Sequence, residues 1–238
     1  LILFHRYGGE ARTAFEEHLV EATGYGVDDE GACPMHFTVS LEHEKRFLEL
    51  FRAVKPAYET HYRVRYDVDF SRQEPHTDTI AVDSKNRPFV KQDGSILFRP
   101  GGHGALLENL NRVKAELLFI KNIDNVVPDR LKEPGIFWKK ILGGLLLRFR
   151  ERLAFFVERL AAREAGDGLV RDAMRFARET LCIRPPQTLE IGSSEAVTSF
   201  LLGKFERPLR VCGMVRNEGE PGGGPFWVRN RGGGQSLQ

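Results

Sequence analysis

The first pattern of hydrophobic and polar residues along the chain is helical. Phe15 and Leu19 recur at a spacing that places them on one helical face. Thr13 and Glu16 have the spacing of a capping box, in which each side chain accepts a hydrogen bond from the backbone N–H of the other residue. A helix is therefore predicted to begin close to Thr13, with His18 on its surface.

The pattern then changes from strand to helix and back. Residues 35–40 are rich in strand-forming side chains, and residues 41–54 return to helical spacing. Residues 62–70 alternate apolar and charged side chains, which predicts a half-exposed strand. Gln73 follows this strand, and its amide could bind the edge of a nucleotide base; an ordinary turn residue is the alternative interpretation.

Residues 98–111 form a glycine-rich loop that leads directly into a helix. Short strands are predicted over 79–83 and 95–98, and the second of them leads into the loop. Glycine lets the backbone approach a ligand closely, and the first turn of a helix offers free N–H groups that suit a phosphate. The sequence therefore predicts either a loop that wraps around part of a nucleotide or a tight turn that caps a helix.

A continuous apolar run follows at residues 115–127. Such a run predicts a central parallel strand that is covered on both faces. Asp124 lies near the C-terminal end of this predicted strand, and that end is where open α/β sheets bind ligands. A carboxylate there is placed to hold Mg²⁺ against phosphate groups; the alternative is an aspartate that caps the following turn.

The character of the chain changes after residue 127. Apolar residues keep helical spacing among many arginines and glutamates over 128–183, which predicts an inserted helical subdomain with a solvated charged face. A strand is predicted over 208–215, and a second glycine-rich loop follows it. Asn217 and Glu220 in this loop suit a sugar, which needs many hydrogen bonds at close approach; a plain connector is the alternative.

These patterns predict an α/β protein in three segments. Residues 1–127 are expected to form the nucleotide-binding part of a domain, residues 128–183 its helical insertion, and residues 184–238 a sugar-binding part of the same domain. Residues 1–4 have the composition of the middle of a buried strand, and residues 232–238 that of a turn entering a further strand. The sequence is therefore expected to be a fragment that lacks both ends of its domain.

Composition narrows the function classes. The net charge is +2, with 35 Lys and Arg against 33 Asp and Glu, so there is no basic stripe of the kind that nucleic-acid binders carry. The longest apolar stretch, residues 141–147, is too short to span a bilayer. Cys33, Cys182 and Cys212 are far apart and lack CxxC spacing, which argues against a disulfide framework or zinc site and favours the reducing cytoplasm.

The order of these motifs resembles that of the UDP-sugar pyrophosphorylases, which have a GT-A-like nucleotidyltransferase fold. Residues 100–104 with Leu106 look like their Pro-Gly-His-Gly-x-Leu nucleotide loop with one glycine inserted, and residues 123–125 look like their Asp-Asn strand end. Gln73 stands where their base-reading glutamine stands.

Nearly the whole chain is also similar to an uncharacterised bacterial family of that superfamily, known only as a domain of unknown function. Four runs carry this similarity, namely residues 11–19, 98–111, 121–127 and 219–227.

The resemblance implies a GT-A/Rossmann-like mixed, mostly parallel sheet with flanking helices. It also implies a reaction in which a sugar 1-phosphate attacks the α-phosphate of a nucleoside triphosphate, giving an NDP-sugar (a UDP-sugar is favoured) and pyrophosphate. Each matched residue would then have a role: Asp124 as a catalytic ligand of Mg²⁺, His103 as a catalytic donor to a phosphate or sugar oxygen, Gly101, Gly102 and Gly104 packing on base and ribose, Gln73 reading the base, and Asn217 and Glu220 contacting the sugar.

Two departures from these relatives affect the prediction. Their glycine-rich loop with Arg and Lys would precede residue 1, and their second acidic region would follow residue 238, so this chain alone is expected to be weakly active or inactive. A GT-A glycosyltransferase is one alternative, with Asp67 and Asp69 as its Asp-x-Asp motif. A non-catalytic sugar-nucleotide sensor, with the helical insertion as its partner surface, is another.

Overall fold

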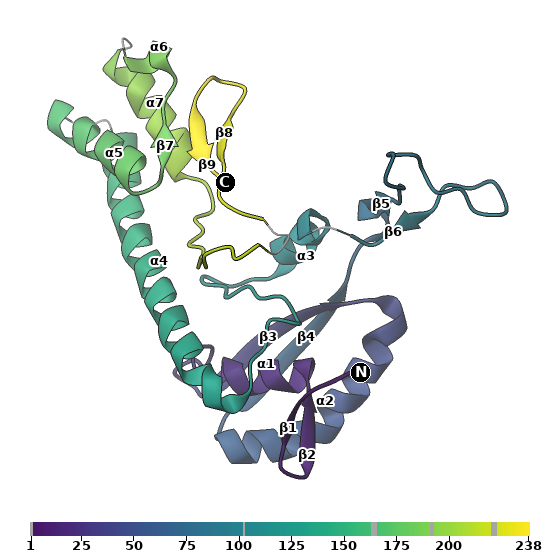
Figure 1. Ribbon diagram of the computed structural model, residues 1–238. Coiled ribbons are helices and arrows are strands. Elements are labelled where there is room, and N and C mark those ends of the chain that lie inside the picture. The colour runs from purple at the N-terminus through teal and green to yellow at the C-terminus, as the bar shows by residue number, and fades with distance from the viewer. Residues whose placement is uncertain (1, 102, 163–165, 191–192, 220–222) are drawn as a thin grey trace. The chain divides into compact units, whose positions relative to one another are not determined.

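The chain has a mixed α/β structure, as the sequence predicts. It divides into two compact units, Leu1–Lys140 and Ile141–Gln238, which are described separately. The computed structural model describes residues 2–101, 103–162, 166–190, 193–219 and 223–238 (Figure 1).

In its described residues, the first unit is built from short strands and four helices, the last of which continues into the second unit. Its elements are β1 (Leu3–Tyr7), β2 (Glu10–Thr13), α1 (Ala14–Ala22), β3 (Ala32–Val39), α2 (Leu41–Tyr62), β4 (Arg65–Arg72), β5 (Thr79–Ile80), β6 (Phe98–Arg99), α3 (Leu107–Arg112) and the start of α4 (Lys132–Ala161). Single 3₁₀ turns lie at Pro75–Thr77, His103–Leu106 and Asp129–Leu131.

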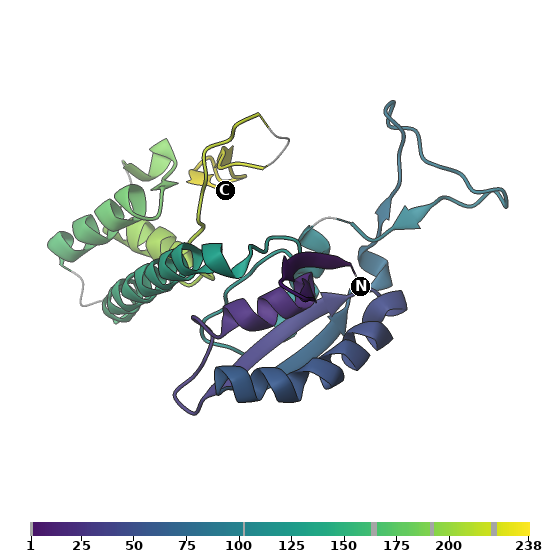
Figure 2. The same ribbon diagram turned by 60° about the horizontal axis from the view of Figure 1, so that its bottom comes forward.

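Strands β3 and β4 form a parallel pair that α2 connects (Figure 2). Cys33 is opposite Tyr66 and Phe37 is opposite Phe70, so alternation puts the apolar side chains of both strands on one face. Helices α1 and α2 cover that face, and the ring of Phe15 lies 4.7 Å from that of Phe37. The predicted strand, helix and half-exposed strand of this region are confirmed.

The other sheets of the first unit are small and antiparallel. β1 pairs with β2, and β5 pairs with β6. The predicted N-terminal strand is therefore present, but the prediction that it is buried is wrong, since Leu3 is 59% and Phe4 is 42% exposed. A two-stranded hairpin covers only one edge of each strand and leaves its faces open.

Helix α1 begins as predicted but is buried on every side. Thr13 is its N-cap, and the capping box is complete: the Glu16 N–H donates to Thr13 Oγ1 at 3.3 Å, and the Thr13 N–H donates to Glu16 Oε2 at 2.8 Å. All nine residues of the helix are buried. The predicted surface position of His18 is therefore wrong. Its Nε2 donates to the carbonyl oxygen of Ile123 at 3.0 Å, because a carbonyl can only accept.

The apolar run at 115–127 lies against α1 and is not a strand. The ring of Phe119 lies 4.8 Å from that of Tyr25, and Ile120 is 70% exposed. The predicted central strand, covered on both faces, is wrong. In the described residues this segment is tied to α1 through side chains, from His18 to the Ile123 carbonyl and from Lys121 to Glu21, and no strand pairs with its backbone, so it has no ladder of hydrogen bonds that would make it a strand.

Burial of α1 also buries the carboxylate of Glu17. This side chain is fully buried and forms an ion pair with Lys132. Tyr7 donates to Glu17 from its hydroxyl at 2.7 Å, and the Nδ1 atom of His5 lies 3.0 Å from the same oxygen. Lys132 also donates to Asp129 at 2.8 Å, so the network links the N-terminal hairpin, α1 and the start of α4.

Glu21, on the same helix, is held by two lysines. Lys121 donates to its two oxygens at 2.9 and 2.8 Å, and Lys139 donates as well. Burial by itself raises the pKa of Glu21, but the hydrogen bonds from Lys121 and Lys139 bring the pKa below its ordinary value. The carboxylate is therefore ionised at neutral pH.

The second unit is mainly helical. It contains most of α4, followed by α5 (Asp167–Glu179), β7 (Ile183–Arg184), α6 (Gln187–Glu190), α7 (Ser194–Phe205), β8 (Trp227–Arg229) and β9 (Gln235–Leu237). Its core joins Phe156 and Leu160 of α4, Ala173 of α5, and Leu201 and Phe205 of α7. The helices predicted within 128–183 are confirmed.

The strands of this unit form one small antiparallel sheet in the order β7–β9–β8. The strand expected at the C-terminal end is confirmed as β9. The strand predicted over 208–215 is wrong: this segment is irregular, and Val215 is 92% exposed. β9 is the central strand of this sheet and is paired on both edges, with β7 and with β8. The 208–215 segment therefore cannot pair with β9.

Charged residues interrupt the apolar side chains of α4, which is 30 residues long. Among the described residues, no helix is both long and apolar enough to cross a membrane.

Substituting Lys132 tests how much its ion pair with the buried Glu17 contributes to the stability of the first unit. Lys132→Met would leave a buried carboxylate without its closest cation, so we expect the free energy of unfolding to fall by about 3 kcal/mol. Lys140→Met is the matched control, because Lys140 is exposed on the same helix, and we expect a change within about 0.5 kcal/mol. Urea unfolding followed by circular dichroism measures both variants. Equal effects would show that the pair does not stabilise the fold.

Candidate functional site

A polar cluster lies at the C-terminal ends of β3 and β4, on the face opposite the core. Thr38 is opposite Ser71 in the register of the two strands. The Oγ atom of Ser71 lies 2.7 Å from His36 Nε2 and 3.3 Å from Thr38 Oγ1. The alternation that directs Phe37 and Phe70 into the core directs these three polar side chains to the other face.

Asn109 joins α3 to this strand end. Its side-chain amide donates to Ser71 Oγ at 2.8 Å and to the carbonyl oxygen of Arg72 at 2.7 Å. Because a carbonyl can only accept, the nitrogen of the amide must face Arg72, and this fixes the orientation of the group. Asn109 is 2% exposed, and its buried Oδ1 atom has no hydrogen-bond partner among the residues that the structure describes. A free acceptor of this kind is costly unless a ligand or water donates to it.

Two side-chain contacts hold α3 against the segment that follows β4. Arg112 Nη1 lies 2.7 Å from Glu74 Oε1, and His76 Nε2 lies 2.9 Å from Glu108 Oε1. The helix that follows the glycine-rich loop is therefore fastened beside the end of β4 by three separate contacts.

Gln73 and Gly101 approach the same pair of adjacent residues. Gln73 donates from Nε2 to Asp78 Oδ1 at 3.2 Å. A Cβ atom on Gly101 would lie 3.2 Å from the hydroxyl oxygen of Thr79, which leaves little room for a side chain. The structure thus brings Gln73 and the start of the glycine-rich loop to one region through Asp78 and Thr79.

The remaining loop residues are less constrained by the structure. A Cβ on Gly104 would meet open space, so steric crowding does not require glycine there. Gly102 lies outside the described residues. The backbone of His103 begins a 3₁₀ turn, and its side chain also lies outside the described part.

Asp124 is not at the end of a strand. It is exposed on a turn of the 115–127 segment, where its carbonyl oxygen accepts from the Val126 N–H at 2.9 Å. Its neighbour Ile123 is tied to α1 through His18. The predicted position at the edge of a sheet is wrong, because the strand that would have carried it there does not form.

The residues expected to contact a sugar belong to the second unit. Asn217 Oδ1 accepts from the Gly219 N–H at 2.7 Å, which is the hydrogen bond of an Asx turn. Glu220 lies outside the residues that the structure describes. Asn217 and Gln73 are therefore in different units.

The Asp-x-Asp pair lies within β4 and not at its end. Asp67 and Asp69 are both exposed on the polar face, and Asp69 lies 3.4 Å from the ring nitrogen Nδ1 of His36. Ordinary strand alternation explains their spacing. The same alternation places Ser71 on the face that carries Asp69. The alternating pattern of residues 62–70, continued by one step, could therefore have identified Ser71 from the sequence.

Exchanging one atom tests the link between α3 and β4. Asn109→Asp would place a carboxylate oxygen against the carbonyl oxygen of Arg72, and we expect a loss of about 2 kcal/mol in the free energy of unfolding. Asn111→Asp is the matched control, since Asn111 is exposed on the same helix. Urea unfolding of the two variants gives the comparison. A loss no larger than that of Asn111→Asp would contradict the role assigned to Asn109.

Comparison with known proteins identifies a family. No curated protein and no solved structure matches the chain. A family model described as a domain of unknown function, DUF4301, matches residues 1–238. The predicted similarity to a family known only as a domain of unknown function is confirmed, and the wider superfamily stays a prediction. The chain belongs to the DUF4301 family.

Proposed function

We propose that the complete protein is a nucleotidyltransferase that forms an NDP-sugar and pyrophosphate from a nucleoside triphosphate and a sugar 1-phosphate, with UDP-sugars favoured. One observation carries the proposal: Gln73 and Gly101 approach the adjacent residues Asp78 and Thr79, in the segment that follows the C-terminal end of β4, where Asn109 fastens α3. Such strand ends are where α/β sheets bind ligands.

The residues of this region have the chemistry that a nucleotide requires. The Gln73 amide has both donor and acceptor atoms, so it can bind the edge of a base. Gly101 allows the backbone to approach a base or ribose without a side chain in between.

The proposed reaction needs alignment more than covalent catalysis. A phosphate oxygen of the sugar 1-phosphate attacks the α-phosphorus of the triphosphate, and pyrophosphate leaves. Neutralising the charge of the phosphates is the main demand on the protein. His103 follows the glycines, so on the resemblance it would donate to a phosphate or sugar oxygen.

The magnesium ion expected from the resemblance has no preformed site in the described chain. Within these residues, no three of His, Cys, Asp and Glu gather where they could hold a metal. Asp124 offers a single exposed carboxylate, and Mg²⁺ is usually held by one or two carboxylates together with substrate phosphates. Asp124 as a magnesium ligand therefore rests on the resemblance alone.

The GT-A-like fold is part of the same proposal. Its support is the β3–α2–β4 unit, a parallel strand pair connected by a helix, with polar side chains at the C-terminal strand ends. Asn217 and Glu220 as sugar contacts, and the cytoplasm as the location, remain predictions from the sequence.

The proposal predicts pyrophosphate release by the complete gene product. It would be supplied with Mg²⁺, each of the four common nucleoside triphosphates and a pool of sugar 1-phosphates. We expect turnover with one nucleotide, a fall of about a hundredfold in kcat for Asp124→Asn, and a weakened nucleotide preference for Gln73→Ala. Pyrophosphate is measured with a coupled phosphatase assay.

Matched controls separate the site from general damage. Asp29→Asn and Gln92→Ala change exposed residues of the same types in loops, and both should keep wild-type turnover. Absence of pyrophosphate with every nucleotide would refute the transferase. If the protein released no pyrophosphate but still bound sugar nucleotides, the result would favour a glycosyltransferase or a sugar-nucleotide sensor.

A further inference from the structure

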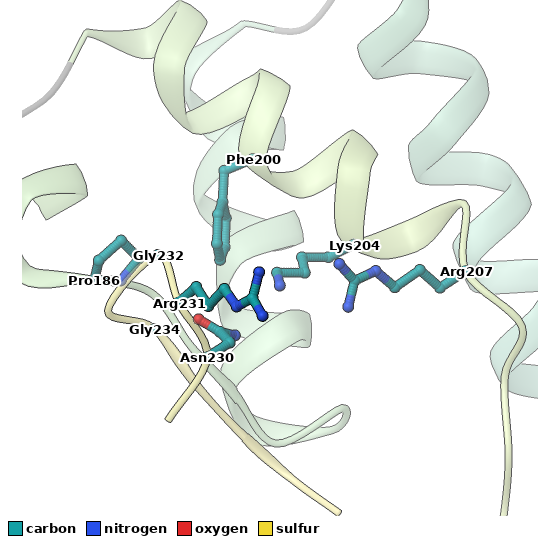
Figure 3. Close-up of a pocket in the computed structure, with 8 residues that line it drawn as sticks. All are labelled: Pro186, Phe200, Lys204, Arg207, Asn230, Arg231, Gly232 and Gly234. Atoms are coloured by element: carbon teal, nitrogen blue, oxygen red, sulfur yellow. The ribbon is translucent and has the colours of Figure 1, made fainter. Parts of the chain in front are cut away.

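A pocket of about 350 Å³ lies in the second unit, between α7 and the turn that joins β8 to β9 (Figure 3). Phe200 and Lys204 line it from α7, and Arg207 follows shortly after that helix ends. Asn230 and Arg231 line it from the turn. The volume is within the range of small-molecule sites, which begins near 300 Å³.

Three cationic side chains converge on this pocket. Figure 3 shows the ends of Lys204 and Arg231 turned toward one another, with Arg207 pointing into the same space. In the described part of the chain, none of the three has a carboxylate partner within ion-pair distance. Burial lowers the pKa of Lys204, and the positive charge of Arg207 lowers it further. Arg207 and Arg231 are exposed, so water screens part of the repulsion among the three cations, and an anion between them would relieve the rest.

An aromatic ring completes the cationic cluster. The Nζ atom of Lys204 lies 5.5 Å from the centre of the Phe200 ring, a cation–π distance. The two residues are four positions apart on α7, so they lie on the same face of the helix. The pocket therefore offers a flat apolar surface next to its positive charge.

The turn that carries Arg231 is held tightly. The Asn230 N–H donates to the Gly234 carbonyl at 2.9 Å, and the Gly233 N–H donates to the Asn230 carbonyl at 3.0 Å. A Cβ on Gly234 would lie 3.0 Å from the carbonyl oxygen of Arg184, so only glycine fits without displacing backbone. The backbone position of Arg231 is thus set by the sheet, and its exposed side chain extends from that fixed point.

We propose that this pocket binds a phosphate group attached to a ring, as in a sugar phosphate or a nucleotide, with Lys204, Arg207 and Arg231 around the phosphate and Phe200 against the ring. Ion-paired hydrogen bonds suit phosphate, and a ring stacks on an aromatic face. The proposal uses none of the residues that carry the nucleotidyltransferase proposal, because Gln73, Gly101 and Asn109 belong to the first unit and the pocket belongs to the second.

Isothermal titration calorimetry of the 238-residue chain tests the pocket. The probes are inorganic phosphate, glucose 1-phosphate and uridine 5′-monophosphate. We expect one ring-bearing probe to bind more tightly than inorganic phosphate, and Arg231→Gln to weaken that binding about tenfold. Whether glucose 1-phosphate or uridine 5′-monophosphate binds tighter decides between a sugar phosphate and a nucleotide.

Two further variants assign the parts of the ligand. Phe200→Leu should lower the affinity for the ring-bearing probe about fivefold and leave the affinity for inorganic phosphate unchanged. Arg210→Gln is the matched charge control, since Arg210 is exposed in the same unit and does not line the pocket. Thermal unfolding checks that each variant is folded.

The outcomes separate this proposal from the nucleotidyltransferase. No binding by any probe, or equal binding by Arg231→Gln and Arg210→Gln, overturns the pocket. If Gln73→Ala abolishes the binding of a probe and Arg231→Gln does not, the probe binds in the first unit. This result would contradict the proposed pocket and would be compatible with the nucleotidyltransferase. If Arg231→Gln abolishes the binding of a probe and Gln73→Ala does not, the result supports the proposed pocket, whatever the outcome of the pyrophosphate assay.

Discussion

The first unit depends on the neutralisation of charge around one buried helix. Every residue of α1 is buried, although the helix carries Glu16, Glu17 and Glu21. A carboxylate out of water is costly unless a cation and hydrogen bonds compensate it. Glu16 is satisfied by the capping box and by the Tyr58 hydroxyl, whereas Glu17 and Glu21 pair with Lys132 and with the lysines at 121 and 139, which are about a hundred residues away along the chain.

This requirement explains where the chain runs after α3. Lys121 and Lys132 can reach α1 only if the segment that contains them lies against the helix. The apolar run between residues 115 and 127 is therefore held against α1, and in the described residues it is not paired with β3 or β4. Asp124 is carried along with it, which places this carboxylate on an exposed turn.

The two regions with ligand-binding chemistry are built on different principles. At the strand ends of the first unit, hydrogen-bonding side chains gather around Ser71, and the Oδ1 atom of Asn109 has no partner among the described residues. In the second unit, the pocket between α7 and the β8–β9 turn has an excess of positive charge beside an aromatic ring. A base edge suits the first arrangement and a phosphate suits the second.

The sequence by itself determined the local features: the capping box of α1, the alternation of β4, and the helix after the glycine-rich loop. Each depends on residues a few positions apart, so spacing alone encodes it. Only the tertiary structure decided that α1 is buried on all sides, that the 115–127 run is irregular, and that Asn109 meets Ser71. The apolar content of a segment indicates that it will be buried. Which element buries it depends on ion pairs and contacts between residues that are far apart in the chain.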